Sequence, residues 1–225
     1  MQVGAPATDK GQKSRRELMA IAIDCFARFG FQGSSVDRIA RMAGVTKGAI
    51  YYHFRDKEDL LAAAVADRIE EFEARVQRAC EGADPLQALR SIAEVCADHA
   101  ISNDRPRFII TLMVEAIETN EEISTQLRDM MRRFRAFVRN WIKQGQEAGT
   151  IRGDRDARSV AAGYVSWILG AEIQLYQDPE HFDFRSALSV FLDQLTADLG
   201  ANVTRAEDPR TRAGRRTEEG ADKAP

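Results

Sequence analysis

Apolar side chains recur at three- and four-residue steps along most of the chain, which is the spacing of one buried helical face. The first such stretch runs from Leu18 to Phe29, and Gly30 is placed to end that helix with a left-handed backbone. No stretch shows convincing strand alternation. The pattern therefore predicts an all-α protein that begins with a long helix.

Two short helices are expected next. Ser34 or Ser35 can cap the first of them, and Gly44 stops it after about two turns. Thr46 can cap the second, which places two apolar side chains one turn apart for the core, Ile50 and Phe54. A long helix followed by two short helices with a tight turn between them forms a helix-turn-helix unit.

Six further helices bring the expected total to about nine. They fall at residues 56–81, 85–100, 108–117, 123–148, 156–177 and 182–199, separated by breaks that contain glycine, proline, asparagine or aspartate. Residues 201–225 have almost no large apolar side chains, so we expect this tail to be disordered.

The composition is that of a globular protein, with 44% hydrophobic and 30% charged residues in 225. No apolar run approaches the length of a membrane span and the N-terminus lacks a secretory signal, so we expect a cytoplasmic protein without a membrane partner. The net charge of −3 is unevenly distributed. Residues 1–58 hold ten Lys and Arg against six Asp and Glu, whereas the remainder holds 22 against 29, which suggests that a basic N-terminal unit meets a polyanion.

The sequence contains no motif that indicates enzymatic chemistry. The three cysteines, Cys25, Cys80 and Cys96, lie far apart within apolar helical patterns, so we expect buried small hydrophobic side chains rather than a redox or zinc site. The three histidines stand in no recognisable motif with a serine or cysteine, and glycine-rich phosphate loops are absent. We expect no enzyme activity, metal or cofactor; a helical enzyme or small-molecule carrier is the rival interpretation.

In a helix-turn-helix unit the second short helix enters the major groove of DNA. Ile50 and Phe54 face inward in this interpretation, which leaves the rest of that helix to contact a duplex. The segment "SSVDRIARMAGVTKGAIYYHFRDKEDLL", preceded by "AIDCFARFGFQG", resembles the DNA-binding region of TetR-family transcriptional repressors. The resemblance covers roughly residues 14–61 and is specific, because IA-x-x-AGV, YYHF and Lys-Glu-x-Leu occur in register. From residue 62 onward it is only architectural.

The resemblance implies four segments. These are a flexible arm over 1–13, the DNA-binding domain over 14–58, a helical effector-binding and dimerisation domain over 59–200, and a disordered tail over 201–225.

The resemblance also implies roles for individual residues. Lys47 would touch base edges or phosphate, and Gly48 would permit close approach to a thymine methyl or the backbone. The chemistry agrees, since a lysine at a helix N-terminus beside a residue without a side chain can reach guanine O6 and N7. The remaining expected DNA contacts are to phosphate, from Ser34, Ser35, Thr46, Tyr51, Tyr52, His53 and Lys57.

Several of these phosphate donors also have a structural interpretation. Tyr51 and Tyr52 can pack within the subunit, and His53 can cap or pack. Lys57 can belong to a solvated charge cluster with its acidic neighbours. Ser35 is first a helix cap, and any phosphate contact is an addition to that role.

The larger domain is expected to hold an effector pocket and a dimer seam. Large apolar side chains are candidates for lining the pocket, with plain core packing as the alternative for each: Phe72, Phe108, Met113, Met131, Phe134, Trp141, Tyr164 and Trp167. The last two helices are candidates for a four-helix bundle with their symmetry mates, with intramolecular core as the alternative: Ile168, Leu175, Tyr176, Leu188, Phe191, Leu192, Leu195 and Leu199.

The expected function is a homodimeric repressor that binds a palindromic operator in double-stranded DNA and is released by a small hydrophobic or aromatic effector. The alternative is a helix-turn-helix regulator, an activator or architectural variant, that responds to no effector.

Overall fold

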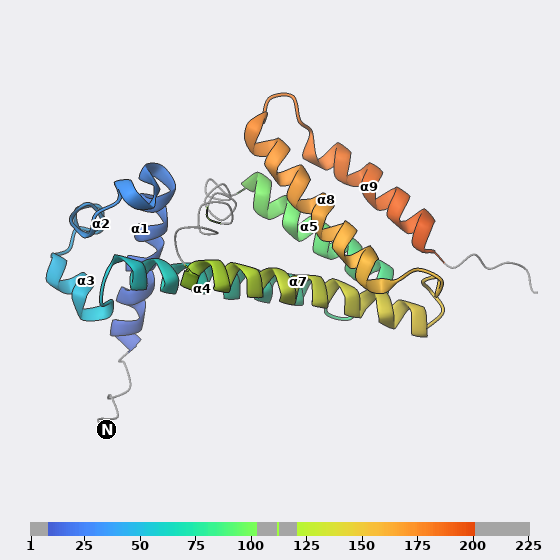
Figure 1. Cartoon of the computed structure of the whole chain (residues 1–225), viewed down its shortest axis with the longest axis horizontal. Helices are drawn as coiled ribbons and strands as arrows, with labels where there is room; N and C mark the ends of the chain where they lie inside the picture. The colour runs from blue at the N-terminus through green and yellow to red at the C-terminus, as the bar shows by residue number, and fades with distance from the viewer. Residues whose placement is uncertain (1–8, 103–111, 113–120, 201–225) are drawn as a thin grey trace, which may run out of the picture.

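The computed structural model describes residues 9–102, 112 and 121–200 (Figure 1). These ranges contain eight α-helices: α1 Asp9–Gly33, α2 Val36–Ala43, α3 Lys47–His53, α4 Lys57–Ala79, α5 Pro85–Ser102, α7 Glu121–Glu147, α8 Ala157–Gln177 and α9 Phe184–Leu199. The predicted all-α class is confirmed. Apart from Leu112, the helix expected over 108–117 lies outside the described residues, as does the tail. Because α1 begins at Asp9, residues 9–13 are helical, which corrects their assignment to a flexible arm.

The break in α1 falls at Gly30, where φ is 67° and ψ is 170°. A positive φ of this kind is open to glycine and strained for other residues. The helix is therefore interrupted at the expected residue, but ψ lies far from the left-handed helical region that was predicted. One further helical turn follows and ends at Gly33.

Side-chain caps fix the starts of the next three helices. Ser35, Thr46 and Asp56 each accept a hydrogen bond from the backbone N–H three residues later. Gly44 ends α2 in the left-handed conformation, with φ 65° and ψ 28°. The caps at Ser35 and Thr46 and the stop at Gly44 agree with the prediction from the sequence, and they define the tight turn between α2 and α3.

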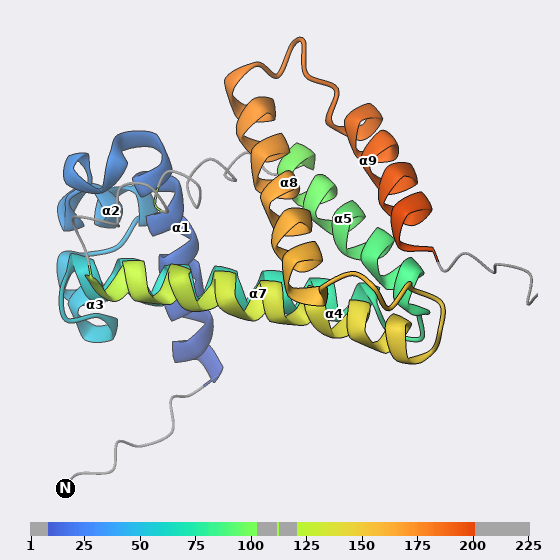
Figure 2. The same cartoon turned by 45° about the vertical axis from the view of Figure 1, so that its right-hand side comes forward.

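The apolar side chains form two core clusters. The first joins α1, α2 and α3 to the N-terminal half of α4, and also includes Leu112 and the beginning of α7. The second joins the end of α4 to α5, the rest of α7, α8 and α9, and contains Cys80 and Cys96. All three cysteines are buried, as expected. Helices α4 and α7 lie side by side and extend through both clusters (Figures 1 and 2), so packing is continuous across the expected domain boundary at residue 58.

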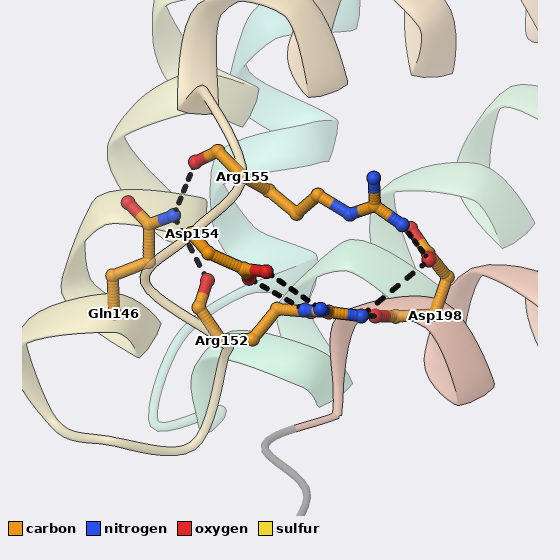
Figure 3. A network of polar contacts seen from close by, with 5 residues as sticks. All are labelled: Gln146, Arg152, Asp154, Arg155 and Asp198. Carbon is orange, nitrogen blue, oxygen red and sulfur yellow. Dashed lines mark hydrogen bonds and ion pairs between the residues drawn. The ribbon is translucent and has the colours of Figure 1, made fainter.

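The turn between α7 and α8 is fastened to the end of α9 (Figure 3). Arg152 forms two hydrogen bonds of 2.6 Å with Asp154, and Arg155 pairs with Asp198 of α9. The Gln146 amide donates to the Arg152 and Arg155 carbonyls at 3.1 and 2.8 Å. These bonds hold the α7–α8 turn against the C-terminal helix of the described chain.

Candidate nucleic-acid interface

Helix α3 separates buried and exposed residues sharply. Ile50 and Phe54 are buried in the first core cluster, as predicted. On the outer side Tyr51 and Tyr52 are 52% and 83% exposed. A tyrosine exposed to this degree contributes little to the core, which argues against the packing interpretation of Tyr52 in particular. The helix therefore presents hydroxyl groups to solvent above an apolar base.

Lys47, the first residue of α3, reaches back to α2. Its Nζ lies 2.6 Å from Oδ2 of Asp37, and both side chains are about half exposed. The hydrogen bond to Asp37 raises the pKa of Lys47, so the ammonium stays charged. This pair places an exposed positive charge at the N-terminus of α3.

Gly48 is not required by packing within the subunit. A Cβ at this position would meet only the Thr46 hydroxyl at 3.7 Å, an ordinary van der Waals contact. Its φ does not lie in the positive region reserved for glycine. The described fold therefore tolerates a side chain here, and packing within the subunit does not explain the glycine.

Ser34 does not occupy the position that was expected. Its side chain is buried, and its hydroxyl donates to the Gly30 carbonyl at 2.7 Å and lies 3.2 Å from the Cys25 carbonyl. The hydroxyl fills the gap that the break at Gly30 leaves in the helical hydrogen bonds, so it cannot also reach a phosphate. Ser35 remains exposed and caps α2.

Lys57 links α4 to the end of α1. Its Nζ donates to the Phe31 carbonyl at 3.0 Å and lies 3.9 Å from the centre of the Phe31 ring. It is therefore not simply a member of a solvated charge cluster. His53 is half-buried, with its ring edge-on to Tyr52 at 4.9 Å.

Asp37 is the charged partner of Lys47 that sequence reasoning missed. It follows the α2 cap by two residues, where an acid ordinarily serves the helix dipole. Helix-turn-helix geometry brings the first turns of α2 and α3 together, so the opposite charges at 37 and 47 were a usable signal. Two exposed apolar residues at the turn, Met42 and Val45, were missed as well, and nothing in the local sequence indicated their exposure.

The six expected effector residues that the structure describes all belong to or pack against the second core cluster, but they form separate contacts there. Phe72 packs against Phe134 at 5.9 Å between α4 and α7, beside Met131, whereas Trp167 stacks on Phe191 at 4.1 Å between α8 and α9. Trp141 lies against Phe137. Tyr164 is a core residue whose hydroxyl donates to the Leu89 carbonyl at 2.6 Å. The remaining two candidates, Phe108 and Met113, lie outside the described residues.

Half of the expected dimer residues belong to the subunit's own core. Four of them are buried in the second core cluster, so they are not available to a partner: Ile168, Leu188, Leu192 and Leu199. The other four are half-buried: Leu175, Tyr176, Phe191 and Leu195. Two residues that were not predicted expose large apolar side chains on these helices, Ile173 at 42% and Val190 at 57%.

Two family models cover most of this architecture. "Bacterial regulatory proteins, tetR family" matches residues 18–64, and "Tetracyclin repressor-like, C-terminal domain" matches residues 85–188. The chain belongs to the TetR family. TetR-family proteins are transcriptional regulators, generally DNA-binding repressors with ligand-binding C-terminal domains.

Individual TetR-family proteins resemble the chain over most of its length. The HTH-type transcriptional regulator AcrR of Shigella flexneri is 28% identical over 185 residues, which cover 78% of this chain and 84% of AcrR. A TetR transcriptional regulator from Chloroflexus aurantiacus superposes with a TM-score of 0.77 at 24% identity, covering 85% of this chain and 98% of that one. FadR from Bacillus subtilis in complex with stearoyl-CoA superposes with a TM-score of 0.71 at 19% identity, covering 81% and 97%. The two structures establish the shared fold.

Within the described ranges, none of the helices is both long and apolar enough to cross a membrane. The same part of the chain holds no group of three or more His, Cys, Asp or Glu side chains placed to bind a metal ion.

Proposed function

We propose that this TetR-family protein is a repressor that binds a palindromic operator as a homodimer and is released by a small molecule. The observation that carries the proposal is the outer face of α3, where exposed Lys47, Gly48, Tyr51 and Tyr52 stand above buried Ile50. A short helix with this polarity enters a major groove with its N-terminal residues at the base edges.

In this proposal Lys47 leaves Asp37 and donates to guanine O6 and N7, while Gly48 allows the backbone to approach a thymine methyl. Thr46, Tyr51, Tyr52 and His53 contact phosphates, and exposed Ser35 does so from the start of α2. Lys57 adds a phosphate contact while its ammonium stays close to the Phe31 ring.

The dimer forms through α8 and α9 of two copies. Ile173 and Val190 supply exposed apolar surface on these helices, and half-buried Leu175, Tyr176 and Leu195 surround them. A two-fold axis through this face presents two recognition helices to half-sites about 34 Å apart, or a multiple of that distance.

Helix α4 connects the two functions, since its N-terminal half packs on the DNA-binding unit and its end packs in the C-terminal core. An effector that favours a displaced α4 would move Lys57 and the attached α1–α3 unit. Release requires different effector affinities for the two conformations, with a coupling of about 1–3 kcal/mol.

The test is selection of bound duplexes from a random-sequence library, followed by sequencing and gel-shift titration. We expect enrichment of an inverted repeat, and Lys47→Ala should weaken binding to it by about 1–3 kcal/mol. Recovery of no common sequence, or unchanged operator affinity in Lys47→Ala, would contradict the assignment.

A further inference from the structure

Arg75, near the end of α4, is half-buried without an acidic partner. No carboxylate lies within 4 Å of its guanidinium among the described residues, although α4 is rich in acids. Two of those acids are paired elsewhere, Glu71 with Arg68 at 2.6 Å and Glu73 with Arg133 at 2.8 Å. A partly desolvated guanidinium ordinarily lies against an anion, so its isolation calls for an explanation.

The polar neighbour of Arg75 is His99 of α5, whose Nδ1 lies 3.4 Å from Nη1. Burial, and then the Arg75 charge, hold the pKa of His99 below its usual value; Glu71 and Arg68 act on it more weakly and in opposite directions. The imidazole is therefore neutral at neutral pH. If Nδ1 accepts from the guanidinium, Nε2 carries the proton and offers a second donor.

Aromatic rings lie on one side of this pair. The Phe72 ring, one turn before Arg75, is 5.4 Å from the His99 ring and 5.9 Å from the Phe134 ring. Buried Cys96 lies one turn before His99, and Arg75 is among the charges that act on its thiol. The surroundings thus combine one positive charge, one neutral donor and apolar surface.

An acid on α8 acts on the same thiol without cancelling that charge. Glu172 influences Cys96 electrostatically, and burial raises the pKa of Glu172 to about 8. Its carboxyl is mostly protonated at neutral pH. The positive charge of Arg75 is therefore not compensated by Glu172 at neutral pH.

We propose that Arg75 and His99 bind the carboxylate of an amphipathic organic acid, whose apolar part lies against Phe72 and Phe134. The guanidinium would form the charge-assisted hydrogen bonds and the imidazole would add one more. This inference names the effector class and rests on the effector release proposed above. It also gives release a route, because Arg75 and Lys57 stand on the same helix, α4 (Figure 2).

The experiment compares three probes with the same alkyl chain, namely octanoate, octanol and octylamine, at pH 7. Binding is followed by the shift in thermal unfolding temperature and by tryptophan fluorescence. We expect octanoate to bind at least about ten-fold more tightly than octanol, the effect of a charge-assisted hydrogen bond, and octylamine to bind most weakly. Arg75→Gln should remove the advantage of octanoate over octanol, and Arg75→Lys should keep part of it.

Arg78→Gln is the matched control, because Arg78 is an exposed arginine one turn farther along α4. It should keep the full preference for octanoate. Comparing charged with uncharged probes in the same variant separates ligand contact from stability, since damage to the fold would weaken binding of octanol as well.

The proposal is overturned if octanoate binds the wild-type protein no better than octanol, or if Arg75→Gln retains the preference. Operator binding, measured separately by gel shift, decides the proposed function. If the protein prefers octanoate through Arg75 but binds no DNA, the proposed carboxylate site is supported and the proposed repressor function is contradicted.

Discussion

At the scale of single residues, the outer face of α3 carries the contact between Lys47 and Asp37, which a bound DNA would have to replace. The pair between Lys47 and Asp37 is exposed on both sides, so it contributes little to stability and is readily exchanged. In the proposed complex a guanine in the groove would offer Lys47 two acceptors in place of Asp37, whereas an arbitrary sequence would offer no fixed partner. Asp37 should therefore lower the affinity for non-cognate DNA more than it lowers the affinity for the operator.

We predict that Asp37→Asn raises affinity for a duplex of arbitrary sequence by roughly three- to ten-fold, the effect of one screened charge contact. Operator affinity should change less, so the specificity ratio falls. Fluorescence anisotropy titrations at two salt concentrations measure both. In a Lys47→Ala background the effect should largely vanish, and Glu58→Gln, which removes an exposed acid from the same unit, should have a smaller effect. If Asp37→Asn raised DNA affinity equally in the wild-type and Lys47→Ala backgrounds, the effect would come from general repulsion between the Asp37 carboxylate and DNA.

Gly48 provides a prediction in which stability and binding change in opposite directions. Gly48→Ala should stabilise the fold by up to about 1 kcal/mol, because alanine favours helix and the site has room for its methyl group. The same methyl should obstruct close approach to DNA and weaken operator binding. Urea denaturation and gel-shift titration measure the two effects. A variant that binds the operator as well as wild type would show that the glycine has no role at the interface.

Glu172 gives a pH-dependent prediction. Burial raises the pKa of its carboxyl from the ordinary 4.5 to about 8, so the folded state binds a proton that the unfolded state releases. Its contribution to stability is complete below about pH 4.5 and is lost as the pH rises through 8. Glu172→Gln should therefore gain thermal stability relative to wild type as the pH increases from 5 to 9. Glu94→Gln, which removes an exposed acid on α5, is the control and should show no such trend. If the thermal stabilities of wild type and Glu172→Gln changed with pH in the same way, the desolvation of Glu172 would be contradicted.

Local chemistry determined which of these residues could be predicted. Caps act over three residues and apolar faces repeat every three or four, so Thr46, Ile50 and Phe54 were correctly placed from sequence. Ser34 was not, because its hydroxyl compensates for the break at Gly30, and that requirement follows from the backbone rather than from the residue type. The partners of Lys57 and Arg75 lie 26 and 24 residues away, distances at which spacing carries no information.

At the scale of helices, an apolar stripe predicts that a helix packs but not what it packs against. Helices α8 and α9 carry more apolar residues than one contact needs, which suggested a dimer seam. In the structure those stripes also face α5 and α7, and this uses Ile168, Leu188 and Leu192 internally. Exposed apolar surface lies instead at Ile173 and Val190 of the same helices, and we propose that a partner copy covers it.

Helix α7 contains a close contact that tests this packing. A Cβ at Gly145 would lie 2.5 Å from Cδ1 of Ile151, the buried residue of the α7–α8 turn. Gly145→Ala should destabilise the protein by about 1–3 kcal/mol through overpacking, despite the better helix propensity of alanine. Chemical denaturation measures the loss.

Two controls locate the cause of that loss. Gly163→Ala in α8, where a Cβ meets nothing within 4 Å, should be neutral or stabilising. Ile151→Ala removes both clashing atoms, Cδ1 and Cγ1, so Gly145→Ala should cost less in that background. Equal costs in the two backgrounds would show that Ile151 is not the obstacle.

At the scale of the whole molecule, the proposed function depends on two copies acting together. One α3 contacts only a few base edges, and a two-fold dimer doubles that number at a fixed separation. We predict that Val190→Lys, alone or with Ile173→Lys, converts the dimer to monomers, because burying a lysine without a partner opposes association. Light scattering gives the mass, with Gln77→Lys, an exposed site on α4, as the control for added charge.

The same variants separate the dimer from the DNA-contacting surface. Val190 lies on α9, and α3 packs in the other core cluster, so each α3 in Val190→Lys should keep its fold and its groove-facing side chains. A monomer loses the gain that comes from engaging two half-sites at once, so operator affinity should fall steeply while affinity for an isolated half-site stays unchanged. Gel shifts with both duplexes measure the two affinities. If monomers bound the full operator as tightly as wild type does, binding of the palindrome would not require two copies of α3, and the proposed two-fold arrangement would be contradicted.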